Sequence, residues 1–591
     1  MKKQDMTIVV VLLGLMLAWP YIYSYFAPPA PVPIEDPVGG PPTAAPAPEA
    51  PEPPELKAAA AVTAAATDMA DESRPRGPEQ RQTLAGPDLV VTVSSYGGGV
   101  TAAELLQYRQ DVRQDSGPVI LDFPGQAALT FAGLPGFSDG NEFELQPGPQ
   151  PESVRLERTT AEGLRLIRTF TLREDYQMEI SDVFANVSEN SLELPEYEVR
   201  LGYMRGLTGD PREAEYLGVD GLQSIGGEGV VYWAKKIPKL FREKAKTVAA
   251  VRLPESVEEY VPQPVDWVAA KNKFFTQILT PAREQQIQAY QVLAQRVLAV
   301  GERENPALAP GKAQVDAVAA GIVFPGVTLQ PGDSLERRMH YYAGPKKFSI
   351  LRRLGMKQEE VMDFGMWSPV CKFLLKILTT TYRYIPNYGV AIILLTMLIR
   401  IIFWPLTHKS TESMKKMQAL QPMMTELRAK HKDNPKKMQA EIMALYRQHK
   451  VNPMGGCLPM IVQIPVFIAL FVVLRSAIEL RFADFLWIKD LSEPERLFAD
   501  ILPIPLNILP LIMAVTMAWQ QRLMPTTDSS QQRIMLVFMP IMMLVMFYMM
   551  PAALVLYWTT NQCIMIAQQL FHKKLGFGLL QILTGRKRDK T

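Results

Sequence analysis

Cysteine and histidine are both scarce in this sequence of 591 residues. The three cysteines are Cys371, Cys457 and Cys563. They form no CxxC pair, and the second and third lie in or beside apolar runs, so the sequence indicates neither a disulfide framework nor a zinc site. His408, His431 and His449 are spaced too widely for a local metal motif. We therefore expect no metal and no other cofactor.

Acidic side chains and lysine are missing from the long apolar runs of the last third of the chain. Proton-coupled transporters typically use relays of Asp, Glu or His, and intramembrane proteases need an Asp pair or a Ser activated by His. The apolar runs therefore argue against both classes of protein. No nucleotide-binding motif of the P-loop type occurs. His340 is the only histidine between residues 27 and 345, which favours a docking or spacer role for that region over sugar chemistry. We expect a protein that is not an enzyme.

The apolar runs are long enough to cross a membrane, whose hydrocarbon core is about 30 Å thick. They cover residues 7–26, 387–406, 457–474, 504–519 and 534–571. The last run is long enough for two crossings, with Pro551 supplying the turn. The first run is not followed by the small residues of a cleavage site, which favours an uncleaved anchor over a signal peptide. Six spans are expected.

Lysine and arginine gather in segments on one side of these spans. The segments are the N-terminus with Lys2 and Lys3, the loop 407–452, the loop with Arg522 and Arg533, and the tail 576–591. The positive-inside rule places such segments in the cytoplasm. The sequence therefore predicts a multi-pass protein of the cell inner membrane, with both termini cytoplasmic and the large segment between the first two spans in the periplasm.

The predicted fold is a helical membrane core of five spans plus an N-terminal anchor, with an all-β periplasmic domain. We expect an anchor at 1–27, a Pro/Ala-rich linker at 28–80, a β-sandwich at 81–345, an amphipathic interfacial helix within 346–384, a five-helix core at 385–575 and a basic tail at 576–591. The sandwich is indicated by apolar side chains at even positions, the period of a half-buried strand. These are Leu164, Leu166, Phe170, Leu172, Tyr176, Met178 and Ile180. For the interfacial helix, a core helix of the sandwich is the alternative.

The loop 407–452 contains two apolar stripes at helical spacing, separated by Asn434-Pro435. The stripes are Met417, Leu420, Met424 and Leu427, then Met438, Ile442 and Leu445. This spacing predicts a short antiparallel helical hairpin. Its basic residues include Lys409, Lys415, Lys416, Arg428, Lys430, Lys432, Lys436 and Lys437. Such a surface suits ribosomal RNA, a targeting factor or anionic lipid, although positive-inside anchoring explains it equally well.

Arg400 lies well inside the run 387–406, where a charge costs roughly 2.5–3.5 kcal/mol on insertion scales. It should therefore face water or a partner, and the alternative is a side chain that snorkels to the headgroups. Thr396 lies one helical turn away on the same face. Other polar residues in the runs are Gln463, Asn507, Thr516, Thr559, Thr560, Asn561 and Gln562. Together they predict a hydrated cavity, while any one alone more often bonds a neighbouring helix.

Methionine is abundant in the run that begins at residue 534. Its members are Met535, Met539, Met542, Met543, Met546, Met549 and Met550. Flexible thioethers adapt to varied apolar partners, so they suit a promiscuous surface, with lipid-facing or core packing as the alternative.

Long motifs give the chain a resemblance to a known family. They are LIRIIFWPLTHKS, ALYRQHKVNPMGGCLPMIVQIPVFIAL and MPTTDSSQQRIMLVFMP, followed by ALVLYWTTNQ. Over about residues 360–575 the sequence resembles the YidC family of bacterial membrane protein insertases, and the region before it is similar to the periplasmic domain of the Gram-negative members. The resemblance implies five helices around a hydrophilic groove that is open to the cytoplasm and lipid.

The resemblance also implies roles for single residues. Arg400 matches the groove arginine and Thr396 a groove residue beside it, while Tyr557 and Trp558 fall in the substrate-contacting region of the last span. Tryptophan at 558 departs from the tyrosine that the family would place there. The apolar part of a substrate would slide along the third and fifth spans, past Ile461, Phe467, Met535, Met539, Met542 and Met546.

The partners implied are nascent membrane proteins, the lipid bilayer, a Sec-type translocon, the ribosome, and the signal recognition particle or its receptor, with no specific nucleic-acid sequence. A channel or small-solute transporter that uses the same cavity is the second hypothesis. A purely structural partner of a larger translocon is the third.

Overall fold

The computed structural model describes residues 78–575 except 124, 224–228, 248–252, 299–313, 432–433, 450, 452–457, 498–504 and 524–528. The chain divides into two units, Met1–Ala61 and Val62–Thr591, and every described residue belongs to the second. The expected anchor at 1–27, the linker before residue 78, Cys457, Lys432 and the tail from 576 lie outside the described residues. So do the side chains of Lys409, Lys415, Ile461 and Met535, whose backbones lie in helices.

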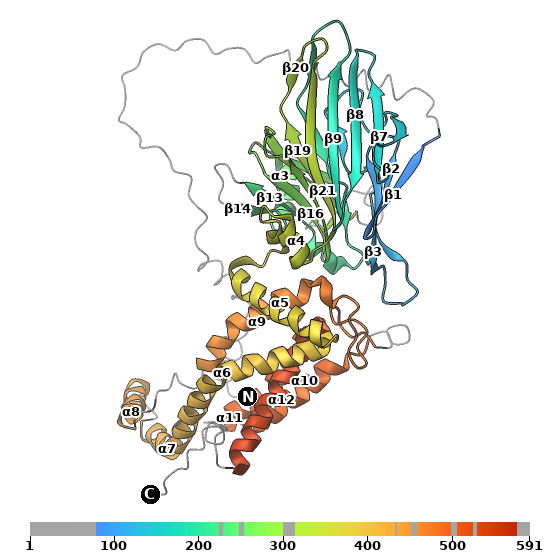
Figure 1. The fold of residues 1–591 in the computed structure, drawn as a ribbon. Helices are drawn as coiled ribbons and strands as arrows, with labels where there is room; N and C mark the ends of the chain where they lie inside the picture. Colours follow the sequence, from blue (N-terminus) through green and yellow to red (C-terminus); the bar gives the residue numbers. More distant parts are fainter. Residues whose placement is uncertain are drawn as a thin grey trace, which may run out of the picture. The chain divides into compact units, whose positions relative to one another are not determined.

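Antiparallel sheets make up the first part of the described chain (Figure 1). The larger sheet has the order β14 (Gly229–Tyr232), β13 (Gly218–Gln223), β16 (Trp267–Lys271), β17 (Phe275–Pro281), β21 (Ser334–Pro345), β9 (Gln177–Asn186), β8 (Leu164–Leu172), β7 (Ser153–Thr159) and β6 (Glu144–Pro147). The second has the order β15 (Ser256–Val261), β18 (Ala289–Arg296), β19 (Val315–Phe324), β11 (Tyr197–Arg200) and β5 (Thr130–Ala132), with β12 (Met204–Arg205) on β19.

Two smaller sheets and two short helices complete this β domain. They are β1 (Arg81–Ala85) to β2 (Leu89–Ser94), β3 (Val100–Arg109) and β4 (Pro118–Asp122); the pair β10 (Leu192–Leu194) and β20 (Val327–Leu329); η1 (Pro211–Tyr216); and α3 (Ile237–Thr247). The predicted β domain, followed by helices in the C-terminal part, is confirmed.

Strands β8 and β9 bury their even positions, as the sequence pattern predicts. Their antiparallel register pairs Leu166 with Phe184 and Arg168 with Asp182. The last pair is a buried two-bonded ion pair, with Nε–Oδ1 and Nη2–Oδ2 distances of 2.7 Å. Nη1 of Arg168 also donates to two backbone carbonyls, so each nitrogen of the buried guanidinium has a hydrogen-bond partner.

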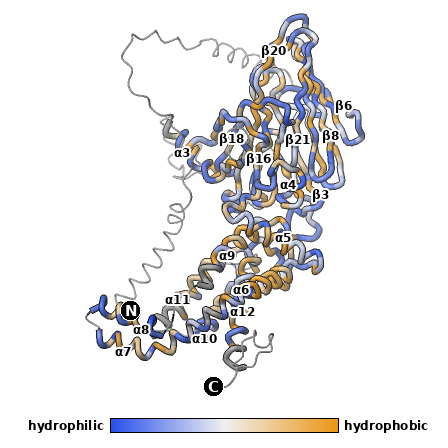
Figure 2. Tube along the Cα trace, turned by 60° about the vertical axis from the view of Figure 1, so that its left-hand side comes forward, coloured by the Kyte–Doolittle hydropathy of each residue, from blue (hydrophilic) through white to orange (hydrophobic). Residues whose placement is uncertain are grey.

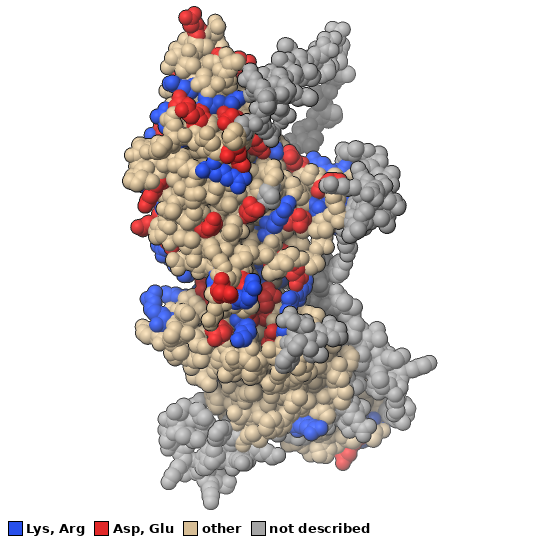
Figure 3. Space-filling model, turned by 90° about the vertical axis from the view of Figure 1, so that its right-hand side faces the viewer, with Lys and Arg blue, Asp and Glu red and all other residues tan. Residues whose placement is uncertain are grey.

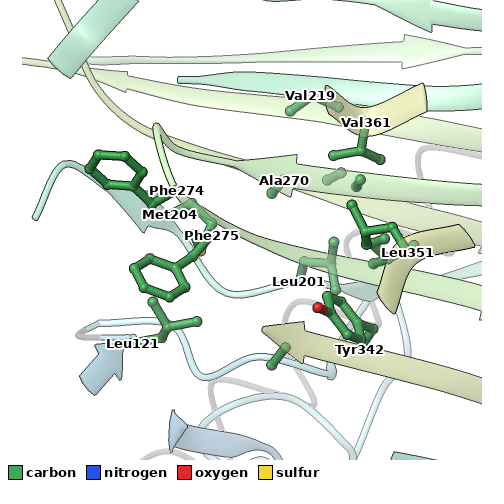
Figure 4. Close-up of a cluster of buried hydrophobic side chains, with 14 of the residues drawn as sticks. Leu121, Leu201, Met204, Val219, Ala270, Phe274, Phe275, Tyr342, Leu351 and Val361 are labelled. Carbon is green, nitrogen blue, oxygen red and sulfur yellow. The ribbon is translucent and has the colours of Figure 1, made fainter. Parts of the chain in front are cut away.

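The two larger sheets face one another across an aromatic core. The ring centroid of Phe184 on β9 lies 5.5 Å from that of Tyr197 on β11, and Tyr197 stacks on Phe324 of β19 at 5.4 Å. Burial of such rings is the main source of stability of a sandwich. Figure 4 shows another part of this core, where Leu351 and Val361 lie close to side chains of the larger sheet.

The segment after β21 therefore packs back onto the β domain. It contains α4 (Phe348–Leu354) and η3 (Gln358–Met362). Nε1 of Trp267 donates to the carbonyl of Met356 at 2.8 Å, and Nζ of Lys271 donates to that of Val361 at 2.9 Å. These bonds fix the point from which the chain continues into the helices.

The C-terminal part is helical. Its elements are η4 (Gly365–Trp367), α5 (Ser368–Tyr384), α6 (Tyr388–Ala419), α7 (Gln421–Lys430), α8 (Pro435–Gln448), α9 (Leu458–Ser476), η6 (Ile478–Leu480), α10 (Ile508–Leu523), α11 (Ser529–Phe547) and α12 (Ala552–Leu575). Figure 2 shows apolar residues concentrated in α5, α6 and α9, whereas α7 and α8 are more polar. Residues 548–551, which include Pro551, separate α11 from α12.

Length and hydropathy single out one helix in the described residues as able to cross a membrane, Tyr388–His408, with a mean hydropathy of 2.2. Gln463–Ser476 and Leu536–Phe547 are shorter apolar helices. The helix α6 does not stop where its apolar run ends but continues to Ala419. Pro422, near the start of α7, has no N–H to extend the preceding helix, so the axis breaks at Leu420.

Helices α7 and α8 are joined by a small apolar core of their own. Its buried members are Leu420, Met424, Tyr446 and Val451, and Met417, Ile442 and Leu445 pack against them. Asn434 caps α8 by accepting a hydrogen bond of 3.1 Å from the backbone N–H of Lys437. The stripe of Met417, Leu420, Met424 and Leu427 is thus divided between the end of α6 and α7.

Candidate functional site

Helix α12 carries polar side chains on two adjacent faces. Tyr557 and Asn561 are four residues apart, and so are Trp558 and Gln562, so each pair lies along one side of the helix. The first pair contacts α6 and α9, and the second contacts α10. Polar groups in apolar helices need such partners, and α12 supplies them to three neighbours.

Arg400 on α6 is 6% exposed and lies among these groups. Its Nε donates to Oδ1 of Asn561 at 2.5 Å. Within the described residues, no carboxylate forms an ion pair with it. Its charge is therefore held by a neutral amide. The side chain is buried among the described helices.

Thr396 lies one turn before Arg400 on the same helix and is fully buried. Its hydroxyl donates to the carbonyl of Ile392 at 2.7 Å, which leaves its oxygen able to accept a further hydrogen bond. On α9, Nε2 of Gln463 donates to the hydroxyl of Tyr557 at 2.5 Å. Arg400, Asn561, Tyr557 and Gln463 thus connect α6 and α9 through α12.

The second face of α12 contacts Thr516 of α10. With the amide of Gln562 oriented to satisfy every group, its nitrogen donates to Oγ1 of Thr516 at 2.7 Å and to the carbonyl of Met513 at 3.0 Å, and its oxygen accepts from Nε1 of Trp558 at 2.8 Å. The indole N–H of Trp558 is therefore used within α12.

Two of the polar residues expected in the cavity lie apart from these contacts. Thr559 donates to the carbonyl of Val555 in its own helix at 2.8 Å. Asn507 lies just before α10, where its Nδ2 donates to the carbonyl of Tyr548 at 2.6 Å and its Oδ1 accepts from the N–H of Arg496 at 2.8 Å. Asn507 holds the loop between α9 and α10.

Sequence reasoning missed Gln520, which is buried on α10 one turn after Thr516. Its Nε2 lies 3.2 Å from the sulfur of Met565, one turn after Asn561 on α12. These two residues continue the contact between the helices. Its four-residue spacing from Thr516 could have indicated this position. It was missed because the expected apolar run ended at residue 519.

An aromatic cluster borders the polar contacts. The ring of Phe467 on α9 lies 5.1 Å from that of Trp558, and Phe547 lies 5.4 Å from it. On α11, Met539, Met542 and Met546 are partly buried. Apolar surface therefore lies beside Trp558.

The basic residues of the loop 407–452 that are described lie on its surface. Lys416, Arg428, Lys430, Lys436 and Lys437 are exposed. Lys416 forms an exposed ion pair of 3.1 Å with Glu412. No group of three or more metal-binding side chains occurs among the described residues.

Comparisons with known proteins identify relatives of both parts. A family model described as YidC periplasmic domain matches residues 81–379, and one described as 60Kd inner membrane protein matches residues 380–577. A membrane protein insertase YidC from Geotalea daltonii is 31% identical over 584 residues, which cover 96% of this chain and 98% of that relative. Another from Pelobacter propionicus is 44% identical over 254 residues, 42% of this chain and 47% of the relative.

Among solved structures, an active YidC insertase with the first transmembrane domain resolved is 19% identical. The match covers 87% of this chain and 98% of that chain, with a TM-score of 0.33.

Proposed function

Because the chain belongs to the YidC family of membrane protein insertases, we propose that it inserts other proteins into the inner membrane and helps them fold. The family is one of insertases and not of enzymes. The observation that carries the mechanism is Arg400, a buried guanidinium in an apolar helix whose hydrogen-bond partner is the neutral amide of Asn561.

A charge at this depth costs several kcal/mol unless it is paired or wetted. The amide oxygen of Asn561 solvates the guanidinium without cancelling its charge. A hydrated groove at this position therefore attracts acidic or polar segments of a nascent chain, which enter it from the cytoplasm. Thr396, Gln463, Thr516, Tyr557 and Gln562 line the groove, and Asn507 holds the loop at its periplasmic end.

The apolar part of the substrate moves along α9 and α11 into the lipid. Phe467, Trp558 and the partly buried methionines of α11 form the surface it passes. Burial of the substrate's apolar area, at about 25 cal/mol per Å², drives the step without nucleotide hydrolysis. The groove shortens the distance over which polar groups are dehydrated.

We place five helices, α6 and α9 to α12, in the membrane, together with an N-terminal anchor. This topology is supported by strongly exposed apolar residues on three of them: Ile401 is 68%, Val515 69% and Val545 71% exposed. Figure 3 shows a broad surface of the helical part without charged side chains. The helix α5, with Phe373 exposed and Leu374 buried, lies in the membrane interface.

The β domain then lies in the periplasm, and the hairpin of α7 and α8 in the cytoplasm. The exposed basic residues of the hairpin receive the nascent chain from the ribosome or from the signal recognition particle and its receptor. A Sec-type translocon is a partner for larger substrates.

Reconstitution tests the proposal. The full chain is incorporated into liposomes and given a small substrate that spans the membrane once and carries an acidic tail. We expect protected substrate with the unaltered chain, a strong loss with Arg400→Ala, and partial retention with Arg400→Lys.

The matched control is Arg522→Ala, which removes an exposed arginine near the end of α10. It should insert the substrate as the unaltered chain does. Flux of small solutes without substrate insertion would instead identify a channel or transporter, and full insertion by Arg400→Ala would remove the role of this charge.

A further inference from the structure

A cavity of about 290 Å³ lies where the end of β3, the start of α6 and η6 meet. Its polar and aromatic lining includes Tyr108, Arg109, Lys347, Tyr388, Glu479 and Arg481. None of these residues belongs to the polar contacts around Arg400. Tyr388 and Arg400 are twelve residues apart in one helix, which separates their backbones by about 18 Å. The cavity is therefore distinct from the proposed groove.

Glu479 is the acidic residue of this lining. Its Oε2 is buried and has no hydrogen-bond partner in the structure. Burial raises the pKa of the carboxyl, and the positive charge of Lys347 opposes that rise. Because Glu479 lines the cavity and its buried carboxylate is costly, a hydrogen-bond donor or cation within the cavity would stabilise it.

The other charged side chains that line the cavity are cationic. The guanidinium of Arg481 donates to the carbonyls of Arg109 and Gln110, at 2.6 and 2.9 Å, and lies 4.2 Å from the ring centroid of Phe482. Burial lowers the pKa of Arg481 to about 10, so it stays charged at neutral pH. With Arg109 and Lys347, the cavity presents three positive groups and one acid. A ligand that carries both an anion and an ammonium matches this set.

The position of the cavity points to a lipid. Tyr388 is the first residue of the apolar helix Tyr388–His408. In the loop that follows η6, Leu486 is 75% and Trp487 38% exposed, and Tyr384 at the end of α5 is 80% exposed. Exposed Trp and Tyr at the end of a membrane helix are typical of the headgroup region. With α6 placed in the membrane as proposed above, the cavity lies at the depth of phospholipid headgroups.

We propose that this cavity binds the headgroup of a phospholipid whose phosphate carries a primary ammonium, as in phosphatidylethanolamine. The phosphate contacts Lys347 and Arg109, and the ammonium donates to Glu479. Arg481 holds the end of β3 against the loop after η6 and so shapes the cavity. The site uses no residue of the groove, and it rests on the proposed membrane placement of α6 but not on the role of Arg400.

Binding of short-chain lipids to the full chain in detergent micelles, measured by native mass spectrometry, tests the assignment. We expect phosphatidylethanolamine to bind about tenfold more tightly than phosphatidylcholine, a difference of about 1.4 kcal/mol. Affinity should fall stepwise as the amine is methylated. Equal affinity for the two lipids would overturn the proposal, and so would binding of soluble phosphoethanolamine as tight as that of the lipid.

Variants test which residue contacts the ammonium of the headgroup and which contacts its phosphate. Glu479→Gln should abolish the preference for phosphatidylethanolamine over phosphatidylcholine, and Lys347→Gln should weaken both lipids and phosphatidylglycerol. The controls Asp484→Asn and Lys489→Gln remove exposed charges of the same loop and should leave binding unchanged. A preference that survives in Glu479→Gln contradicts the assignment. If that variant does not fold, the methylation series on the unaltered chain decides alone.

Discussion

Nε of Arg400 on α6 donates a 2.5 Å hydrogen bond to Oδ1 of Asn561 on α12. The two residues are 161 positions apart, and their contact joins the helix with the clearest membrane character to the last helix of the described residues. The neutral amide of Asn561 accepts a hydrogen bond from the guanidinium and leaves its positive charge uncompensated. This distinction between solvation and neutralisation can be tested directly.

Asn561→Asp should reduce insertion of acidic-tailed substrates several-fold while the protein stays folded. The new carboxylate would form an ion pair with Arg400. Because the two opposite charges largely cancel, the pair would attract an acidic tail much less than Arg400 alone does. Protease protection in liposomes measures the effect. A substrate whose tail carries Asn in place of Asp is the control, and its insertion should change little. Equal loss for both tails would show that the variant damages the groove generally.

Gln463 and Tyr557 offer a test of the link between α9 and α12. Tyr557→Phe and Gln463→Leu each remove one partner of their 2.5 Å hydrogen bond, and each should lower the unfolding free energy by about 0.5–1.5 kcal/mol. The double variant should cost less than the sum, since the second change removes a bond that is already lost. Thermal unfolding in detergent measures all three. Strict additivity would mean that the two side chains do not interact.

The sequence predicts the faces of elements better than their partners. Even positions of β8 and β9 face the core because strand periodicity decides this locally. The same rule places Arg168 and Asp182 in the core, but their pairing depends on the register of two strands, which no local pattern specifies. Arg400 could be singled out from the cost of its charge. Its contact with Asn561 could not, because it depends on how α6 and α12 pack.

The contacts of loop residues and the ends of helices are harder still to predict from the sequence. Asn507 lies in an apolar run, yet its bonds to Arg496 and Tyr548 come from loop geometry. Helix α6 continues past the apolar run to Ala419 and ends before Pro422, which has no N–H to extend it. Hydropathy alone marks the apolar part of a helix and not its end.

Lys346 should make the stability of the β domain depend on pH. It is buried beside Lys271, Asp220 and Asp363, and burial lowers its pKa to about 7 from 10.5. The unfolded chain then binds more protons between these values, so stability rises with pH from about 7 towards 10.5, by at most about 1.36 kcal/mol per pH unit. Lys346→Met should be more stable than the unaltered chain at pH 7, with an advantage that shrinks as pH rises.

Denaturant unfolding of the full chain at several pH values, followed by the β-sheet signal in circular dichroism, measures this advantage. The control is Lys357→Met, which removes a lysine outside this buried group of charges. Its stability difference from the unaltered chain should not vary over the same range. A constant difference for Lys346→Met as well would mean that Lys346 keeps its proton in the folded state.

The side chain of Glu495 caps the N-terminus of α10, although it lies 13 positions before Ile508 in the sequence. Its Oε2 and Oε1 accept from the backbone N–H groups of Ile508 and Leu509 at 2.7 and 2.8 Å. The helix itself provides no acceptor for these first N–H groups, and they lie at the positive end of the helix dipole, where a carboxylate is favourable. Glu495→Ala should therefore lower the unfolding free energy by about 1.5–3 kcal/mol, the range for a hydrogen bond to a charged group. Glu495→Gln, which keeps one acceptor, should lose less.

Hydrogen exchange at the start of α10 is the sharper measurement, because it reports the cap locally. Exchange of Ile508 and Leu509 should accelerate in Glu495→Ala, while α12 remains protected. The neighbouring variant Glu493→Ala removes a carboxylate that contacts Lys273 of the β domain and should leave those two amides unchanged. Faster exchange in both variants would show that the whole loop, and not the cap, holds the first turn of α10.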